Sequence, residues 1–77
     1  MTATNDEWTE RAKRFFRAEM QRSGVSYDDL VKRLAEIGIE ETVGSVTVKV
    51  NRGTYPAWFL FAAMKAIGRE HIRIDDA

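Results

Sequence analysis

The chain has 77 residues, of which 44% are hydrophobic, and its twelve basic side chains balance twelve acidic ones. This length allows one small domain with a single core, and the lack of cysteine excludes disulfides and cysteine-ligated zinc. No apolar run approaches the roughly 20 residues of a membrane span, so we expect a cytoplasmic protein that does not enter a membrane.

The first predicted helix covers about residues 5–23. The sequence "TNDE" has the pattern of a capping box, with Thr4 as the N-cap and Glu7 at the third helical position. Five apolar side chains then recur at helical spacing and predict the buried stripe of this helix: Trp8, Ala12, Phe15, Phe16 and Met20. Gly24 is typical of the residue that follows a helix.

The second and the last predicted helices cover about residues 27–37 and 56–67. Ser26 and Asp29 form another capping-box pattern ahead of the second helix. Pro56 suits the first turn of the last helix, because its missing N–H is not needed there. Residues 69–77 would then form an extended C-terminal tail, which is either frayed or contains a short strand with Ile72 and Ile74 on one side.

Residues 43–52 allow two interpretations. The alternation of Val46, Val48 and Val50 with polar residues favours a strand over residues 45–51. A helix that begins after Thr42 would instead place Val46 and Val50 on one face, and Gly53 suits its end. We prefer the helix, because a lone strand among helices would leave its backbone groups unpaired. The fold class predicted for residues 1–77 is therefore all-α, a single compact four-helix bundle.

The stretches "GVSYDDLVKRL" and "VKVNRGTYPAWFLFAAMKAIG" resemble the Cro/cI-type (Xre-like) helix-turn-helix domains. In those domains a Gly-hydrophobic-Ser/Thr pattern opens the second helix, and the recognition helix ends in a hydrophobic-x-Arg-Gly turn. The stretches "RGTYPAWFL" and "MKAIG" are also similar to a group of short uncharacterised bacterial proteins. The resemblance implies a lambda-repressor-like bundle and a transcriptional regulator that binds double-stranded DNA.

The third helix would be the DNA reader. Its outward side supplies hydroxyl, cationic and apolar groups that suit bases and phosphates, and two further residues lie where such folds place groups near phosphates. The candidate DNA-binding residues are Thr42, Ser45, Val48, Lys49, Arg52, Thr54 and Ser26. The charge distribution agrees with this reader, because residues 44–73 carry five basic side chains and one acidic one.

The last helix carries more aromatic surface than a core of this size needs. We expect part of it to contact a second copy, since a homodimer would place two reading helices one DNA turn apart. The candidate partner surface consists of Trp58, Phe61, Lys65, Ile72 and Ile74. The alternative function is a non-catalytic protein-interaction module on the same bundle that no longer binds DNA. Zero net charge, lengthened connectors around Gly38 and a glycine at position 44 favour this alternative.

Catalysis finds no support in the residue types. The one histidine, His71, lies in the polar tail, and no cysteine accompanies it. Metal and nucleophilic sites need such groups at ligand or hydrogen-bonding spacing. We therefore expect no enzyme, no metal, no cofactor and no small-molecule ligand.

Overall fold

The computed structural model describes residues 3–77, with side chains from Asn5 onward. It contains four α-helices and a short 3-10 turn: α1 (Ala3–Ser23), α2 (Tyr27–Glu36), α3 (Val43–Arg52), α4 (Ala57–Ala66) and η1 (Ile74–Asp76). No strand is present in this part of the chain. The predicted all-α class with four helices is confirmed.

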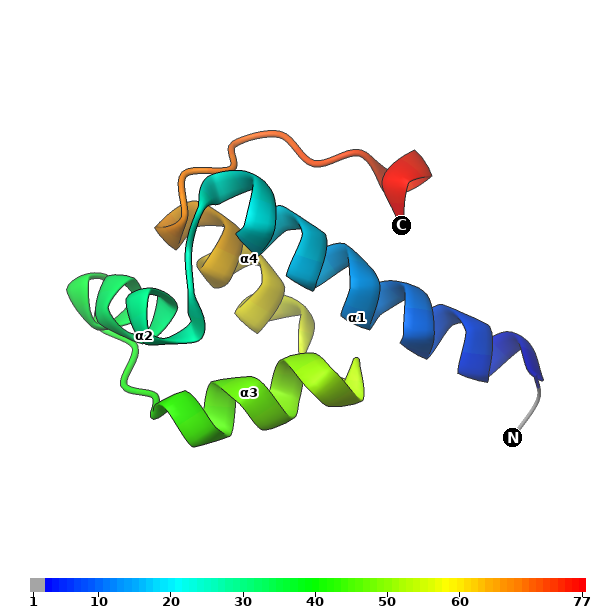
Figure 1. The fold of residues 1–77 in the computed structure, drawn as a ribbon, viewed down its shortest axis with the longest axis horizontal. Coiled ribbons are helices and arrows are strands. Elements are labelled where there is room, and N and C mark those ends of the chain that lie inside the picture. The colour runs from blue at the N-terminus through cyan, green and yellow to red at the C-terminus, as the bar shows by residue number, and fades with distance from the viewer. Residues whose placement is uncertain (1–2) are drawn as a thin grey trace.

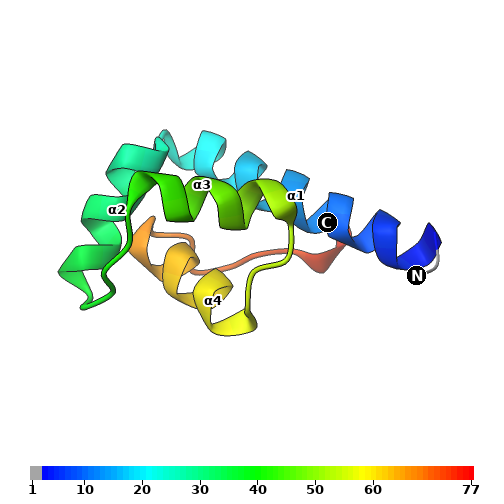
Figure 2. The same ribbon diagram turned by 90° about the horizontal axis from the view of Figure 1, so that it is seen from below.

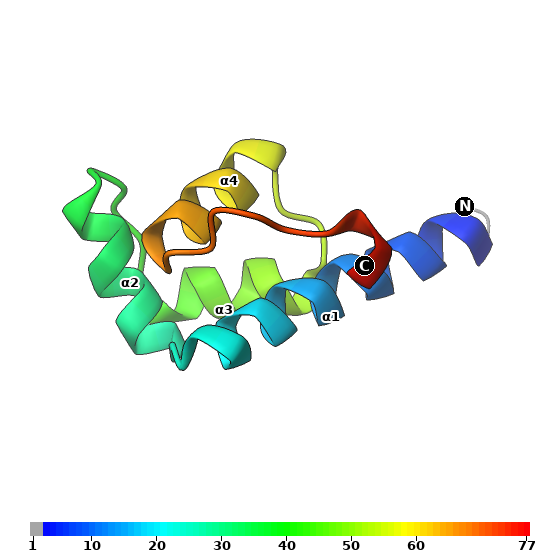
Figure 3. The same cartoon turned by 90° about the horizontal axis from the view of Figure 1, so that it is seen from above.

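The helices form a compact globule in which α2 and α3 each pack against two other helices (Figure 1). Helix α3 packs along α1 on one side and against α2 on the other, and α2 in turn packs against α4 (Figure 2). The tail after α4 runs back across the side of the bundle opposite α3 and ends beside the middle of α1 (Figure 3). The tail therefore leaves the α3 side of the molecule uncovered.

The core is aromatic at its centre and aliphatic around it. Phe16 of α1 stacks on Phe59 of α4, with ring centroids 5.8 Å apart, and meets Tyr55 edge-on at 5.1 Å. Four fully buried aliphatic side chains close the core from the other two helices: Leu30, Leu34, Val46 and Val50. Burying each such side chain stabilises the fold by about 1.5–3 kcal/mol. The third helix is therefore held by its packing.

The helical interpretation of residues 43–52 is confirmed, and its cap is local. The Ser45 N–H donates to Thr42 Oγ1 and the Thr42 N–H donates to Ser45 Oγ, both at 3.0 Å. Val46 and Val50 lie four residues apart on the buried face, whereas Val48 is 47% exposed on the opposite side. The valine alternation therefore does not describe one face of this element.

Two expectations near the N-terminus are wrong. The first helix includes Ala3, so Thr4 lies within it and is not the N-cap; the side chain of Thr4 lies outside the described residues. Trp8 is exposed rather than buried, and its ring lies against the Arg11 guanidinium, 4.8 Å from the centroid. The Arg11 guanidinium thus covers one face of the Trp8 indole. Because a guanidinium is best accommodated in contact with solvent, this pairing favours a surface position for Trp8.

The two isoleucines of the tail line the same apolar groove beside α1 and α4, but they differ in exposure. Ile72 is half-buried and packs against the core, whereas Ile74 is 73% exposed at the start of the 3-10 turn. Arg73, between them, is extended, so Ile72 and Ile74 point to the same side of the tail, and the turn begins only at Ile74. The extended tail predicted for residues 69–77 is therefore extended only up to this turn.

Candidate nucleic-acid interface

The outward face of α3 carries four residues that the fold does not cover. They are the exposed residues on the side opposite Val46 and Val50: Gly44, Val48, Asn51 and Arg52. We call this set the α3 outward face. Within the described residues, the side chains of Asn51 and Arg52 have no hydrogen bond or ion pair. Their polar groups remain available to a partner.

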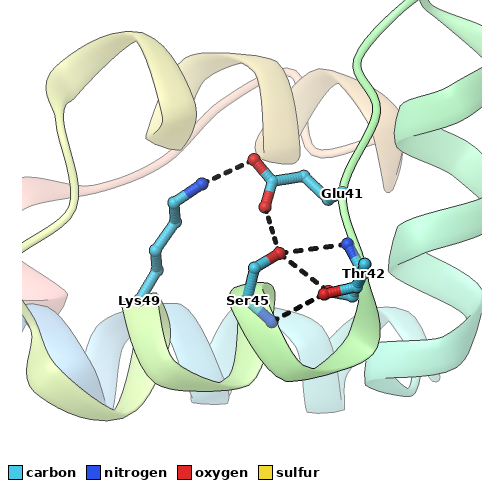
Figure 4. A network of polar contacts seen from close by, with 4 residues as sticks. All are labelled: Glu41, Thr42, Ser45 and Lys49. Carbon is cyan, nitrogen blue, oxygen red and sulfur yellow. Dashed lines mark hydrogen bonds and ion pairs between the residues drawn. The ribbon is translucent and has the colours of Figure 1, made fainter.

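Glu41 organises the polar side of α3 that faces α4. It lies in the connector between α2 and α3, and only 8% of its side chain is exposed. One carboxylate oxygen, Oε2, lies 2.5 Å from the Lys49 ammonium, and the other, Oε1, accepts a hydrogen bond from the Ser45 hydroxyl at 2.6 Å (Figure 4). The structure therefore joins Thr42, Ser45 and Lys49 in one network around a carboxylate.

The Ser45 hydroxyl has two acceptors within hydrogen-bonding distance. Its oxygen lies 2.6 Å from Glu41 Oε1 and 3.0 Å from the Thr42 carbonyl oxygen. A hydroxyl has a single hydrogen to donate. The shorter contact to a charged acceptor is the stronger of the two, so the hydrogen points to Glu41 and the backbone carbonyl is left to the helix.

The same network keeps Glu41 ionised. Burial is the largest influence on its pKa and raises it, but the hydrogen bonds from Lys49 and Ser45, together with the Lys49 charge, outweigh burial and lower the pKa. A carboxylate that is satisfied at both oxygens in this way can stay charged while buried.

Lys49 points toward α4 rather than toward the α3 outward face. Its ammonium lies over the Phe59 ring at 5.0 Å from the centroid, in addition to its ion pair with Glu41. The side chain is 33% exposed. Ser45 is likewise half-buried. Sequence reasoning placed both on the exposed side of α3, and the structure moves them to its flank.

Gly53 sets the position of Arg52. Its φ of +67° is in the left-handed region, and a Cβ at this position would lie 2.2 Å from the backbone oxygen of Thr9. The end of α3 therefore touches the backbone of α1, which only glycine allows. Arg52 precedes this contact, and its side chain extends into solvent.

The two remaining DNA-binding candidates lie apart from each other. Ser26 caps α2, where its hydroxyl accepts from the Asp29 N–H at 3.1 Å and its own N–H donates to Asp29 Oδ2 at 3.3 Å. The backbone hydrogen bond from Ser26 is the main reason why the pKa of Asp29 is lowered. Thr54 is exposed in the connector after α3, beside the α3 outward face in sequence. Its position allows a contact that continues this face.

The candidate partner surface is only partly contiguous. Phe61 is 66% exposed on α4 and lines a groove of about 340 Å³ together with Lys65 and Ile72. Trp58 is also exposed on α4 but lies outside this groove. Ile74 lines a second, apolar groove of about 300 Å³ between α1, α4 and the tail, and Ile72 lines both grooves.

Sequence reasoning missed two buried acids, Glu41 and Glu19. Glu19 Oε2 lies 3.2 Å from both Arg22 Nη1 and Arg69 Nε, and its side chain is buried. The signal for Glu19 was its spacing, because it falls three residues after Phe16 on the buried stripe. Glu41 offered no comparable signal, since it lies in a connector.

These acids neutralise much of the positive segment. Lys49 is paired with Glu41, and Arg69 with Glu19. Arg73 lies 3.9 Å from Asp75 in solvent, where such a pair contributes little. Arg52 and Lys65 remain without an ion pair in the described part of the chain, so the segment does not form a continuous basic patch.

Two findings bear on other classes of site. The described residues hold no group of three His, Asp or Glu side chains placed to bind a metal ion. They also hold no helix of the length and apolar character that would cross a membrane.

Comparison with known proteins identifies one family. Its members share a domain of unknown function, DUF6471, which matches residues 8–72 and so covers α2, α3, α4 and most of α1. No curated protein and no solved structure matches the chain significantly. The matched stretch contains the buried core, the Glu41 network and the α3 outward face, and the chain belongs to the DUF6471 family.

Proposed function

We propose that this DUF6471 protein binds double-stranded DNA sequence-specifically through the α3 outward face and acts as a small homodimeric transcriptional regulator. The observation that carries the proposal is the composition of this face. Asn51 and Arg52 present unpaired polar groups beside an exposed Val48, on a helix whose opposite face is anchored in the core. The order of the four helices supports a helix-turn-helix-like arrangement, in which α3 enters the major groove.

Each residue of the face has a matching chemistry in the groove. Arginine pairs with guanine or with phosphate, asparagine pairs with adenine, and an apolar side chain meets the thymine methyl group. Arg52, Asn51 and Val48 provide these three groups within about one helical turn. The face can therefore distinguish base pairs and need not rely on charge alone.

Gly44 adds an independent reason to regard the face as functional. A Cβ at this position would meet nothing closer than Thr42 Oγ1 at 3.9 Å, so the fold itself has room for a side chain. Glycine in an exposed helix costs about 1 kcal/mol relative to alanine. The missing side chain suits close approach of the helix to a DNA or a protein partner, so Gly44 marks the face without deciding between the two functions.

The test is binding of labelled duplexes at low and high salt. When phosphate contacts drive binding, the logarithm of the binding constant falls linearly with the logarithm of the salt concentration. Arg52→Glu should abolish binding. Arg73→Glu makes the same charge change in the tail, on the side opposite α3, and should bind like the wild type. No binding by the wild type at low salt, or equal loss in both variants, contradicts the proposal.

The homodimer part of the proposal rests on the groove beside Phe61. Its apolar centre is flanked by Lys65 and Glu70, whose opposite charges can pair across a two-fold axis. Phe61→Ser should shift the protein to monomer in sedimentation experiments, because the exposed ring contributes little to the fold. Val43→Ser, an exposed apolar residue on α3, serves as the control. A monomeric wild type at high micromolar concentration contradicts this part.

A second candidate function is a protein-interaction module. It is favoured by the exposure of Trp58 and Phe61 on α4, since large exposed aromatic side chains are typical of interfaces. Self-association that depends on Phe61, together with no DNA binding at low salt, supports this candidate over the first.

A further inference from the structure

Lys49 is a basic residue next to the α3 outward face. Its ammonium is already ion-paired within the domain. The residue lies three residues before Arg52 and four after Ser45, so it borders the exposed side of the helix. Its ammonium is nevertheless drawn toward α4 by Glu41 at 2.5 Å and by the Phe59 ring at 5.0 Å (Figure 4). A lysine side chain has a flexible four-carbon stem, and its charge can occupy either position.

We propose that Glu41 restrains DNA binding by holding the Lys49 ammonium away from the phosphate backbone, so that the Glu41–Lys49 pair sets the affinity of the α3 outward face. The inference rests on the proposed DNA-binding function. Glu41 touches no DNA in this arrangement. It acts through Lys49 and is a positioning residue.

The geometry makes the restraint specific to one acid. Glu41 is buried, and its second oxygen is fixed by the Ser45 hydroxyl, which in turn belongs to the α3 cap. The carboxylate therefore has one position, and an ammonium paired with it is held toward α4 rather than toward the α3 outward face. Glu40, its neighbour, is exposed and has no ion pair among the described residues. The two glutamates carry the same charge but differ in their hold on Lys49.

Release of Lys49 adds one cation to the face. Each additional phosphate contact steepens the log–log dependence of binding on salt by about 0.9 for duplex DNA. With Glu41→Ala we expect several-fold tighter binding at low salt and a slope steeper by about this amount. Removal of any acidic side chain reduces the electrostatic repulsion of DNA, and Glu40→Ala measures this general effect. We expect a smaller increase in affinity from Glu40→Ala, with an unchanged slope of log binding constant against log salt.

A double-mutant cycle separates release of Lys49 from other effects. Lys49→Met keeps the apolar stem beside Phe59 and removes the ammonium. If Glu41 acts through Lys49, then in the Lys49→Met background Glu41→Ala should increase the duplex affinity no more than Glu40→Ala does. The labelled duplex is the probe in all variants, and circular dichroism confirms that each one is folded. Should Glu41→Ala not fold, Glu41→Gln keeps the size and an acceptor for Ser45, and a smaller gain in the same direction is expected.

The outcomes distinguish this inference from the proposed function. Wild-type binding that requires Arg52, with no difference between Glu41→Ala and Glu40→Ala, overturns the restraint and leaves DNA binding intact. A gain that persists in the Lys49→Met background also overturns it. Absence of DNA binding in the wild type and in Glu41→Ala overturns both proposals.

Discussion

Replacement of Gly53 by alanine tests how α3 is docked on α1. The φ of +67° at this position costs a non-glycine residue roughly 1–2 kcal/mol, and loss of glycine flexibility in the unfolded chain returns part of it. The new Cβ would also lie 2.2 Å from Thr9 O, well inside the 3.0 Å limit for real Cβ contacts. Overpacking of this kind costs about 1–3 kcal/mol. We expect Gly53→Ala to lose about 3 kcal/mol of unfolding free energy.

Gly24 provides a matched control. Its φ is also +67°, but a Cβ there would meet nothing within 4 Å, so Gly24→Ala should lose only about 1 kcal/mol. Urea unfolding followed by circular dichroism measures both. A domain of this size has a total stability of about 4–11 kcal/mol, so the difference is well resolved. Equal losses in the two variants would refute the close approach of α3 to the α1 backbone.

Three further predictions concern polar groups. The folded-state pKa of Glu41 lies below its ordinary 4.5, so its ion pair contributes stability at neutral pH that is lost as the pH falls through the folded-state pKa. Glu41→Gln should make the unfolding free energy fall less steeply between neutral and acid pH. Unfolding free energies measured across this pH range check the prediction. Tyr55→Phe removes the hydrogen bond to the Ala12 carbonyl oxygen, 2.8 Å long, and should cost about 1 kcal/mol in urea unfolding; no loss would show that water replaces it without cost. Glu19→Gln leaves Arg22 and Arg69 without a countercharge and should cost about 2 kcal/mol, measured by thermal unfolding, with an unchanged melting temperature contradicting the role of the buried acid.

Local signals in the sequence predicted most of the helices and their ends. The Ser26–Asp29 capping box and the hydroxyl of Thr42 mark the starts of α2 and α3, because capping uses atoms within three residues of each other. Glycines follow α1 and α3 with positive φ, as expected for helix ends. The buried positions of Phe16, Leu30 and Leu34 also follow from helical periodicity alone.

The candidate site was less predictable, because it depends on which groups meet across the fold. Glu41 and Lys49 are eight residues apart, and neither periodicity nor capping relates them. Their contact arises because Glu41 lies just ahead of the α3 cap, where its carboxylate meets the Lys49 ammonium that lies over the Phe59 ring. A helical projection gives the direction in which each side chain leaves the helix, but it does not show which groups from other segments lie there. It therefore predicted that Lys49 is exposed.

The sequence by itself determined α1, α2, α4 and the aromatic and aliphatic composition of the core, because helix capping and apolar periodicity act over a few residues. Only the tertiary structure decided that α3 rather than a strand follows Thr42 and that Trp8 lies outside the core. It also decided that Arg52 and Asn51 face solvent while Lys49 and Arg69 are paired with buried acids. The physical reason is that burial and ion pairing are set by segments far apart in the chain, and the free energy of a charge depends on what those segments place beside it.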